Sequence, residues 1–196
     1  MVFSKDEIKL VLEKHYPPLY ENELELFLSI CRIEAYQNKE IILKKNSVDK
    51  QVLIILKGAA RAYNINKDGH EINSHLRATG FLFGDPTVFT NDATLLDIEA
   101  IGETHVLKFN VEKLELLAFD YPNLMKFYLA MLKEVIVTFS HRINTFVCMD
   151  AKERYYDLIK WNPEYLKNTY DKHIATFLGI TPLTLHRIKK KIKIIK

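Results

Sequence analysis

The residues best suited to bind another molecule lie in one basic segment near the end of the chain, HIATFLGITPLTLHRIKKKIK from His173. Residues 171–196 hold seven lysines and arginines against one acid, although the net charge of the whole chain is only +3. The rest of the chain therefore has a net charge of −3. A mildly acidic body with a basic end indicates that this end meets a polyanion.

The spacing within this segment is that of two short helices that cross at a tight turn. Ala175 is small enough to lie at the crossing, and Gly179 tolerates the positive φ that the turn requires. Thr181 is placed to cap the second helix, and Pro182 occupies its first turn, where the missing N–H is not needed. The pattern predicts a helix-turn-helix.

The outer face of the second helix carries polar and basic side chains. Such a helix fits the major groove of DNA, with its first turns over base edges and its basic end over phosphates. We expect Arg187 to bond a guanine through two hydrogen bonds, and the lysines to meet phosphates. The alternative is a helical hairpin with a solvated basic face. The predicted DNA contacts are Thr181, Thr184, His186, Arg187, Lys189, Lys190, Lys191 and Lys193.

The elements before this segment change character twice. Ser4 and Glu7 form a capping-box pattern at the start of a helix, and ENELELFLSICR predicts a second one. Residues 32–109 are short runs of β-branched and aromatic residues separated by turns, with NKDG at 66–69 as a hairpin signal. This spacing is typical of an antiparallel barrel or jelly roll.

A long helix is predicted after Pro122, and it has two apolar stripes. A helix packed only on its own domain needs one stripe, so the second indicates a partner, most simply the same helix of another subunit. The alternative is a helix buried within a monomer. The first stripe is Leu124, Tyr128, Met131, Val135, Phe139 and Phe146, and the second is Leu129, Leu132, Ile136, Ile143 and Val147. Asp150 is predicted to cap the next helix.

Taken together, these elements resemble the Crp/Fnr family of bacterial transcription regulators over essentially the whole chain. LKGAARAY (56–63) resembles that family's strand–glycine–strand element, GFLFGD (80–85) the opening of its phosphate-binding cassette, and IATFLGITPLTLHRIKK its DNA-binding motif. The resemblance implies an α+β fold with an N-terminal antiparallel β jelly-roll barrel of the cyclic nucleotide-binding type. It also implies a sensor barrel with flanking helices at 1–121, a dimerisation helix at 122–149 and a helix-turn-helix domain at 150–196.

The same resemblance implies an effector pocket at Gly84, Asp85, Thr94, Leu95, Phe139 and Ser140. Cyclic-nucleotide-binding members of the family carry a glutamate for the ribose and an Arg-Ser/Thr pair for the cyclic phosphate. Here Asp85 stands at the glutamate position, and Thr94 and Leu95 stand at the Arg-Ser positions. An unpaired phosphate in a half-buried pocket costs several kcal/mol, so cyclic AMP is disfavoured as the effector unless Arg61 or Arg77 reaches in.

Three other functions are alternatives for this sequence. They are a cyclic-nucleotide-responsive regulator, a regulator without an effector whose barrel contacts RNA polymerase, and a cupin-like metal enzyme. His70 and His75 lie five residues apart, which puts them on opposite faces of a strand and disfavours a shared metal. Two cysteines are too few for a disulfide framework, a four-cysteine zinc site or an iron–sulfur cluster. We predict neither catalysis nor a cofactor.

The expected partners are double-stranded DNA and a second copy of the chain, with an unidentified small effector and RNA polymerase as further partners. No apolar run is long enough to cross a bilayer, and MVFSKDEIKL lacks the apolar core of a signal peptide. A cytoplasmic location without a membrane partner is therefore predicted.

Overall fold

The structure is a computed structural model that describes residues 3–48, 50–90 and 92–195, with side chains as far as residue 191. Its helices are α1 (Lys5–Glu13), α2 (Glu21–Ser29), α3 (Val111–Asp120), α4 (Pro122–Cys148), α5 (Ala151–Trp161), α6 (Pro163–Asn168), α7 (Asp171–Phe177) and α8 (Pro182–Ile195). Its strands are β1 (Cys31–Tyr36), β2 (Ile41–Leu43), β3 (Gln51–Ile65), β4 (Glu71–Ala78), β5 (Leu82–Phe83) and β6 (Asp97–Asn110), and a short 3-10 helix η1 spans Pro86–Phe89.

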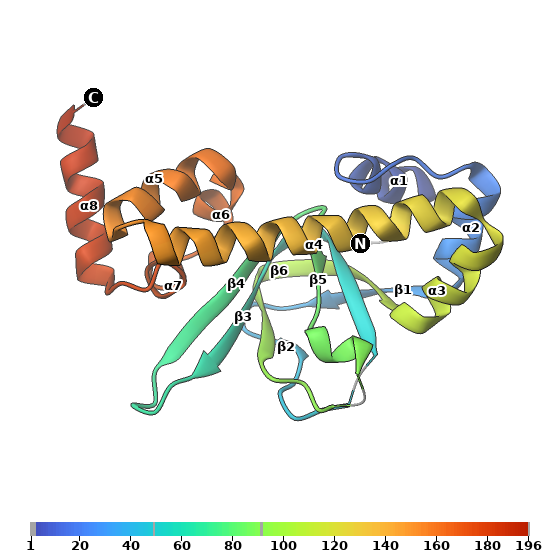
Figure 1. Cartoon of the computed structure of the whole chain (residues 1–196), viewed down its shortest axis with the longest axis horizontal. Helices are drawn as coiled ribbons and strands as arrows, with labels where there is room; N and C mark the ends of the chain where they lie inside the picture. The colour runs from blue at the N-terminus through green and yellow to red at the C-terminus, as the bar shows by residue number, and fades with distance from the viewer. Residues whose placement is uncertain (1–2, 49, 91, 196) are drawn as a thin grey trace.

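The long helix α4 lies across the whole molecule, above a curved antiparallel sheet (Figure 1). Helices α1 to α3 gather at one end of α4, and α5 to α8 gather at the other end. The predicted α+β fold, with strands in the first part of the chain and helices at its end, is confirmed. The capping box of Ser4 and Glu7 is present at the start of α1.

Two long strands, β3 and β6, form the centre of the sheet. The order is β1-β6-β3-β4, with β2 added to β6 and β5 added to β3. The β3–β6 register shifts on both sides of Lys57, next to Gly58, whose φ is 91°. A Cβ at Gly58 would lie 2.5 Å from the carbonyl oxygen of Glu103, so only glycine lets the two strands come this close. The strands bend at this point and curve into the barrel.

The predicted hairpin at NKDG joins β3 to β4. Asn66 Oδ1 accepts hydrogen bonds from the main-chain N–H groups of Asp68 (3.0 Å) and His70 (2.9 Å). Gly69 has a φ of 81°, which this turn requires and glycine adopts without strain. The hairpin prediction is therefore confirmed.

Two apolar cores hold α4 and the C-terminal helices against the sheet. In the first, the ring of Phe27 from α2 packs on those of Phe109 and Phe127, with centroids 5.1 and 5.2 Å apart. In the second, Leu76 of β4 packs among residues of α5 to α8, including Ile174. The helical end of the chain therefore shares a core with the sheet.

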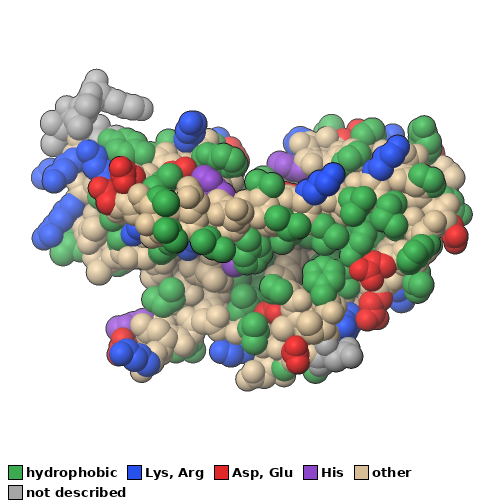
Figure 2. All heavy atoms as spheres, in the orientation of Figure 1, with side chains coloured by type: hydrophobic (Ala, Val, Ile, Leu, Met, Phe, Trp, Pro, Cys, Tyr) green, Lys and Arg blue, Asp and Glu red, His purple; other side chains and the backbone are tan. Residues whose placement is uncertain are grey.

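Most of the predicted second stripe of α4 stays on the surface of the single chain, although its member Leu132 is half-buried. Ile136 is 66% exposed and Ile143 is 63% exposed, whereas Leu124 and Met131 of the first stripe are buried. In Figure 2, apolar side chains gather along α4 and over the adjoining part of the barrel. The second stripe is therefore free to meet another surface.

The break after α4 lies where the domain boundary was predicted. Met149 is extended, and Asp150 caps α5 by accepting hydrogen bonds from the N–H groups of Lys152 (2.8 Å) and Glu153 (2.9 Å). The division into 1–121, 122–149 and 150–196 stays a prediction.

Candidate nucleic-acid interface and barrel pocket

Helices α7 and α8 lie on either side of the turn predicted at Gly179, and α8 begins at Pro182. Ala175 is fully buried at their crossing, and its carbonyl oxygen accepts a hydrogen bond of 3.0 Å from the N–H of Ile180. Gly179 has a φ of 68°. Thr181 Oγ1 accepts from the N–H of Thr184 (3.1 Å), as expected of a cap at the start of α8. The local sequence thus forms the predicted crossing and turn.

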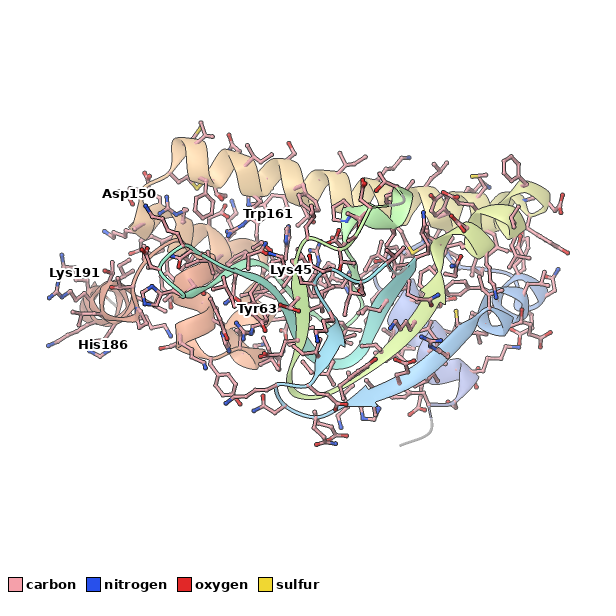
Figure 3. All side chains as sticks on the ribbon, turned by 90° about the horizontal axis from the view of Figure 1, so that it is seen from below. Lys45, Tyr63, Asp150, Trp161, His186 and Lys191 are labelled. Carbon is pink, nitrogen blue, oxygen red and sulfur yellow. The ribbon has the colours of Figure 1, made fainter. Side chains whose placement is uncertain are left out.

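The inner face of α8 is anchored, and this leaves its basic face outward. Leu185 and Ile188 are buried against Ile174 and Leu178, in the core that also holds α5. His186 and Lys191 project from α8 at the end of the molecule, away from the barrel (Figure 3). No acidic residue occurs from Thr181 to the end of the chain. The outer face of α8 is therefore positively charged.

The predicted DNA-contact residues differ in their exposure and in the partners of their side chains. Lys189 is half-buried and forms an ion pair with Asp171 of α7. The hydroxyl groups of Thr181 and Thr184 bond each other at 2.9 Å. The exposed members of the set are Thr181, His186, Arg187, Lys190 and Lys191, and the side chain of Lys193 lies outside the described part of the chain. Their contacts with DNA stay predictions.

Two half-buried arginines support the turn between α7 and α8, and the sequence analysis did not identify either of them. Arg142 of α4 donates to the carbonyl oxygen of Phe177, and Arg154 of α5 donates from Nε to that of Leu178 (3.0 Å). Both guanidinium groups lie over the ring of Phe146, 4.4 and 4.8 Å from its centroid. These contacts use the carbonyl groups that the end of α7 leaves free.

Burial, and after it the nearby charge of Arg154, lower the pKa of Arg142 to about 9. A signal for this role existed in the sequence. Arg142 lies seven residues after Val135 and three after Phe139, so it falls within the first apolar stripe.

A buried polar network joins the barrel to α7. Asn73 of β4 donates from Nδ2 to the carbonyl oxygen of His173 (3.0 Å) and to Thr176 Oγ1 (2.8 Å). Arg61 donates to Asn73 Oδ1 (3.1 Å) and pairs with Glu99 at 3.0 Å. Arg61 is thus held in this network, and it does not line the barrel cavity.

A cavity of about 100 Å³ lies between the barrel and α4. Three of the predicted effector residues, Gly84, Asp85 and Phe139, line it. The other three do not: Thr94 is buried elsewhere, Leu95 is 61% exposed, and Ser140 is exposed on α4. The cassette resemblance therefore places half of its residues at the cavity.

The carboxylate of Asp85, which stands at the family's glutamate position, accepts hydrogen bonds from within its own loop. Asp85, only 1% exposed, accepts from the N–H (3.0 Å) and hydroxyl (2.8 Å) of Thr87 and from the N–H of Leu95 (2.9 Å). Thr94 donates its hydroxyl to the carbonyl oxygen of Lys44 (2.7 Å). These groups hold the loop of residues 84–95 together, and Arg77 from β4 supplies an arginine to the cavity instead.

Among the described residues, no three His, Cys, Asp or Glu side chains are grouped to hold a metal ion. His70 is exposed at the hairpin turn, whereas His75 lines the cavity. Over the described ranges, no helix combines the length and apolar content needed to cross a bilayer.

Comparisons with known proteins agree with this arrangement. Residues 33–121 match the family model of the cyclic nucleotide-binding domain. No curated protein matches the chain in sequence. FixK2 from Bradyrhizobium japonicum has a similar solved structure, with a TM-score of 0.69 and 20% identity over 84% of this chain and 85% of that chain.

Two further solved structures are similar. The c-di-GMP responsive global regulator CLP from Xanthomonas campestris has a TM-score of 0.67 and 14% identity, over 89% of this chain and 92% of that one. CooA from Carboxydothermus hydrogenoformans has a TM-score of 0.63 and 19% identity, over 94% and 84%. At these identities the comparisons establish a shared fold that includes the C-terminal helices.

Proposed function

Because the chain carries a cyclic nucleotide-binding domain at residues 33–121 and has the fold of the Crp/Fnr regulators, we propose that it is a DNA-binding transcriptional regulator of that type. The observation that carries the proposal is the outer face of α8. This face is basic, has no acid, is anchored from behind by Leu185 and Ile188, and lies at one end of the molecule (Figure 1). It functions as a helix-turn-helix reader of duplex DNA.

In this proposal α8 enters the major groove. Arg187, exposed near the middle of the helix, reads a guanine through two hydrogen bonds, and His186 is a further base contact. Lys190 and Lys191 meet phosphates and raise affinity without reading sequence. Lys189 would exchange its pairing with Asp171 for a phosphate, so its contribution is smaller than that of the exposed lysines.

The regulator acts as a homodimer. The exposed stripe of α4, with Ile136 and Ile143 at its centre, packs against the same stripe of a second copy. Two copies related in this way present two α8 helices to successive major grooves, about 34 Å apart, on a pseudo-palindromic site.

An effector binds in the barrel cavity and changes the DNA affinity through α4, which lines the cavity and also holds the turn after α7. Arg77 does reach the cavity, but cyclic AMP is disfavoured because Asp85 is used by its own loop, because Thr94 and Leu95 supply no cation, and because a cavity of about 100 Å³ is smaller than the ~150 Å³ that holds benzene. The alternative is a cyclic-nucleotide-responsive regulator, which the domain match favours. We propose no catalysis, a cytoplasmic location and RNA polymerase as a further partner.

Selection of duplexes from a random library tests the DNA-binding proposal. The expected result is a two-fold symmetric site, and the Arg187→Ala variant should lose the preference for one base pair of each half-site. Lys113→Ala, which removes an exposed lysine of α3 at the far end of α4, is the matched control and should select the same site. Recovery of no enriched sequence by the unmodified chain would contradict the proposal.

A further inference from the structure

Two polar side chains at the barrel cavity have buried atoms without a hydrogen-bond partner. Arg77 of β4 is only 4% exposed, and its Nε has no partner. His75, two residues earlier on the same strand, has no partner at Nε2. Both side chains line the cavity. A buried donor without an acceptor destabilises the fold, and a ligand that supplies the acceptor removes this cost.

The rest of the lining is apolar and aromatic, apart from the internally bonded Asp85 and the phenol of Tyr128, which donates to Glu115. The cavity of about 100 Å³ is somewhat smaller than a ~150 Å³ apolar cavity that holds benzene. The occupant is therefore a small, mostly apolar molecule. Its apolar contacts would be Phe83, Val88, Phe109, Leu114, Met131 and Val135.

The charges at the Arg77 end favour an anion. Arg77 and Arg142 bring two positive charges, and Glu134 of α4 brings one negative charge, 3.4 Å from Nη1 of Arg77. His75 is neutral at pH 7, because burial and the two nearby arginines lower its pKa to about 3. Glu134 pairs with Arg77 but is not among the residues that line the cavity.

From this geometry we propose that the cavity binds a carboxylate with an apolar body of about four to seven carbon atoms. The carboxylate accepts a hydrogen bond from Arg77 Nε and lies beside His75, and the apolar body lies among the side chains of β3, β6 and α4. The proposal rests on the proposed function, since it names the chemistry of the effector.

The polar end of this site is not the loop of residues 84–95. It lies on β4 and faces α4 and α6, because Nη1 of Arg77 reaches the hydroxyl of Tyr165 at 3.5 Å as well as Glu134. A carboxylate on Arg77 therefore changes the balance of contacts that join β4 to α4 and α6. The effector would therefore lie next to α4 and α6, the helices packed beside the C-terminal pair α7 and α8.

Calorimetric titration of the full chain tests the proposal with two pairs of probes, hexanoate against hexanol and benzoate against benzyl alcohol. Each pair has the same apolar body, and only the acid offers an anionic acceptor. We expect the acids to bind at least about tenfold more tightly than the alcohols, the difference typical of one charge-assisted hydrogen bond. Equal affinities within each pair, or binding of cyclic AMP alone, would overturn the proposal.

Two variants locate the binding site. Arg77→Gln removes the guanidinium and should abolish the preference for acid over alcohol. Val135→Phe adds volume on a half-buried wall of the cavity and should weaken both acids at least about tenfold, even if Arg77→Gln fails to fold. Unchanged hexanoate binding by Val135→Phe would place the ligand elsewhere and overturn the site.

The proposed ligand class and the proposed DNA-binding function can be refuted independently of each other. Arg187→Ala should bind hexanoate as the unmodified chain does, because α8 is remote from the cavity lining. Selection of a DNA site without carboxylate binding would overturn the ligand class alone. Carboxylate binding without selection of any DNA site would overturn the proposed function alone.

Discussion

The ring of Phe146 on α4 lies directly against Gly179, in the turn between α7 and α8. A Cβ at Gly179 would lie 2.9 Å from Phe146 Cε1, closer than two carbon atoms can pack. The same ring is covered by the guanidinium groups of Arg142 and Arg154, which also bond the carbonyl groups of the turn. The end of α4 is thus shaped to hold this glycine.

The first prediction follows from that contact. Gly179→Ala should lower the free energy of unfolding by about 1–2 kcal/mol from its left-handed backbone, and by about 1–3 kcal/mol more from crowding against Phe146. Gly69→Ala is the matched control, since Gly69 also has a positive φ but has no atom within 4 Å of its added Cβ. Urea unfolding of both variants measures the difference, and equal losses would mean that the Phe146 contact contributes nothing.

The second prediction separates base reading from phosphate contact on α8. Arg187→Ala should cost about 1–3 kcal/mol on the selected site and relax preference at one base pair. Lys190→Ala should weaken binding to all sequences alike and reduce the salt slope by about 1. Fluorescence anisotropy at several salt concentrations measures both. An Arg187→Ala loss that is the same on every sequence would make Arg187 a phosphate contact.

The third prediction concerns the exposed stripe of α4. Ile143→Asp should dissociate the dimer, because it puts a charge in the middle of the proposed apolar interface without disturbing a buried residue of the single chain. Asn144→Asp adds the same charge one residue later, about 100° around the helix, and should leave the dimer intact. Sedimentation velocity distinguishes the two, and a monomeric unmodified chain would refute the dimer.

The fourth prediction is a loss of stability in mild acid. The pKa of His75 in the folded chain is about 3, below its ordinary value of 6.5. Between these two pH values His75 is therefore protonated in the unfolded chain but neutral in the folded chain. The contribution of His75 is complete above pH 6.5 and is lost progressively as the pH falls towards 3. At pH 5 the loss is about 2 kcal/mol.

Urea unfolding at pH 7 and pH 5 measures this loss. His75→Gln should reduce the difference between the two pH values, and His70→Gln, at the exposed hairpin turn, should leave it unchanged. His173, whose pKa burial lowers to about 4, keeps part of the acid sensitivity in both variants. Identical pH dependence in all three chains would show that His75 is not the residue responsible.

Local rules predicted the parts of the structure that depend on neighbouring residues. Thr181 caps α8, Gly179 adopts a positive φ and Asn66 closes its turn, because each needs only the residues beside it in the chain. The resemblance to the Crp/Fnr regulators, drawn largely from such motifs, is confirmed at the level of the fold. The limits of the long helix were predicted on the same basis.

The pocket could not be predicted in this way. The role of Asp85 depends on where Leu95 returns to meet it, and the role of Arg77 depends on how β4 faces α4 and α6. An arginine within an apolar pattern, such as Arg142, is equally compatible with a surface position until the packing is known. These roles depend on residues far apart in sequence, so a local spacing such as that of Arg142 can suggest burial but cannot identify the partners.

One continuous helix, α4, both lines the cavity and ends at the turn before α8. From Val135 to its last residue it extends about 20 Å. It therefore works as a lever arm: a tilt of about 10° at the cavity would swing its far end by about 3–4 Å. In the proposed dimer, that swing would change the distance between the two α8 helices and so their match to successive major grooves of the duplex.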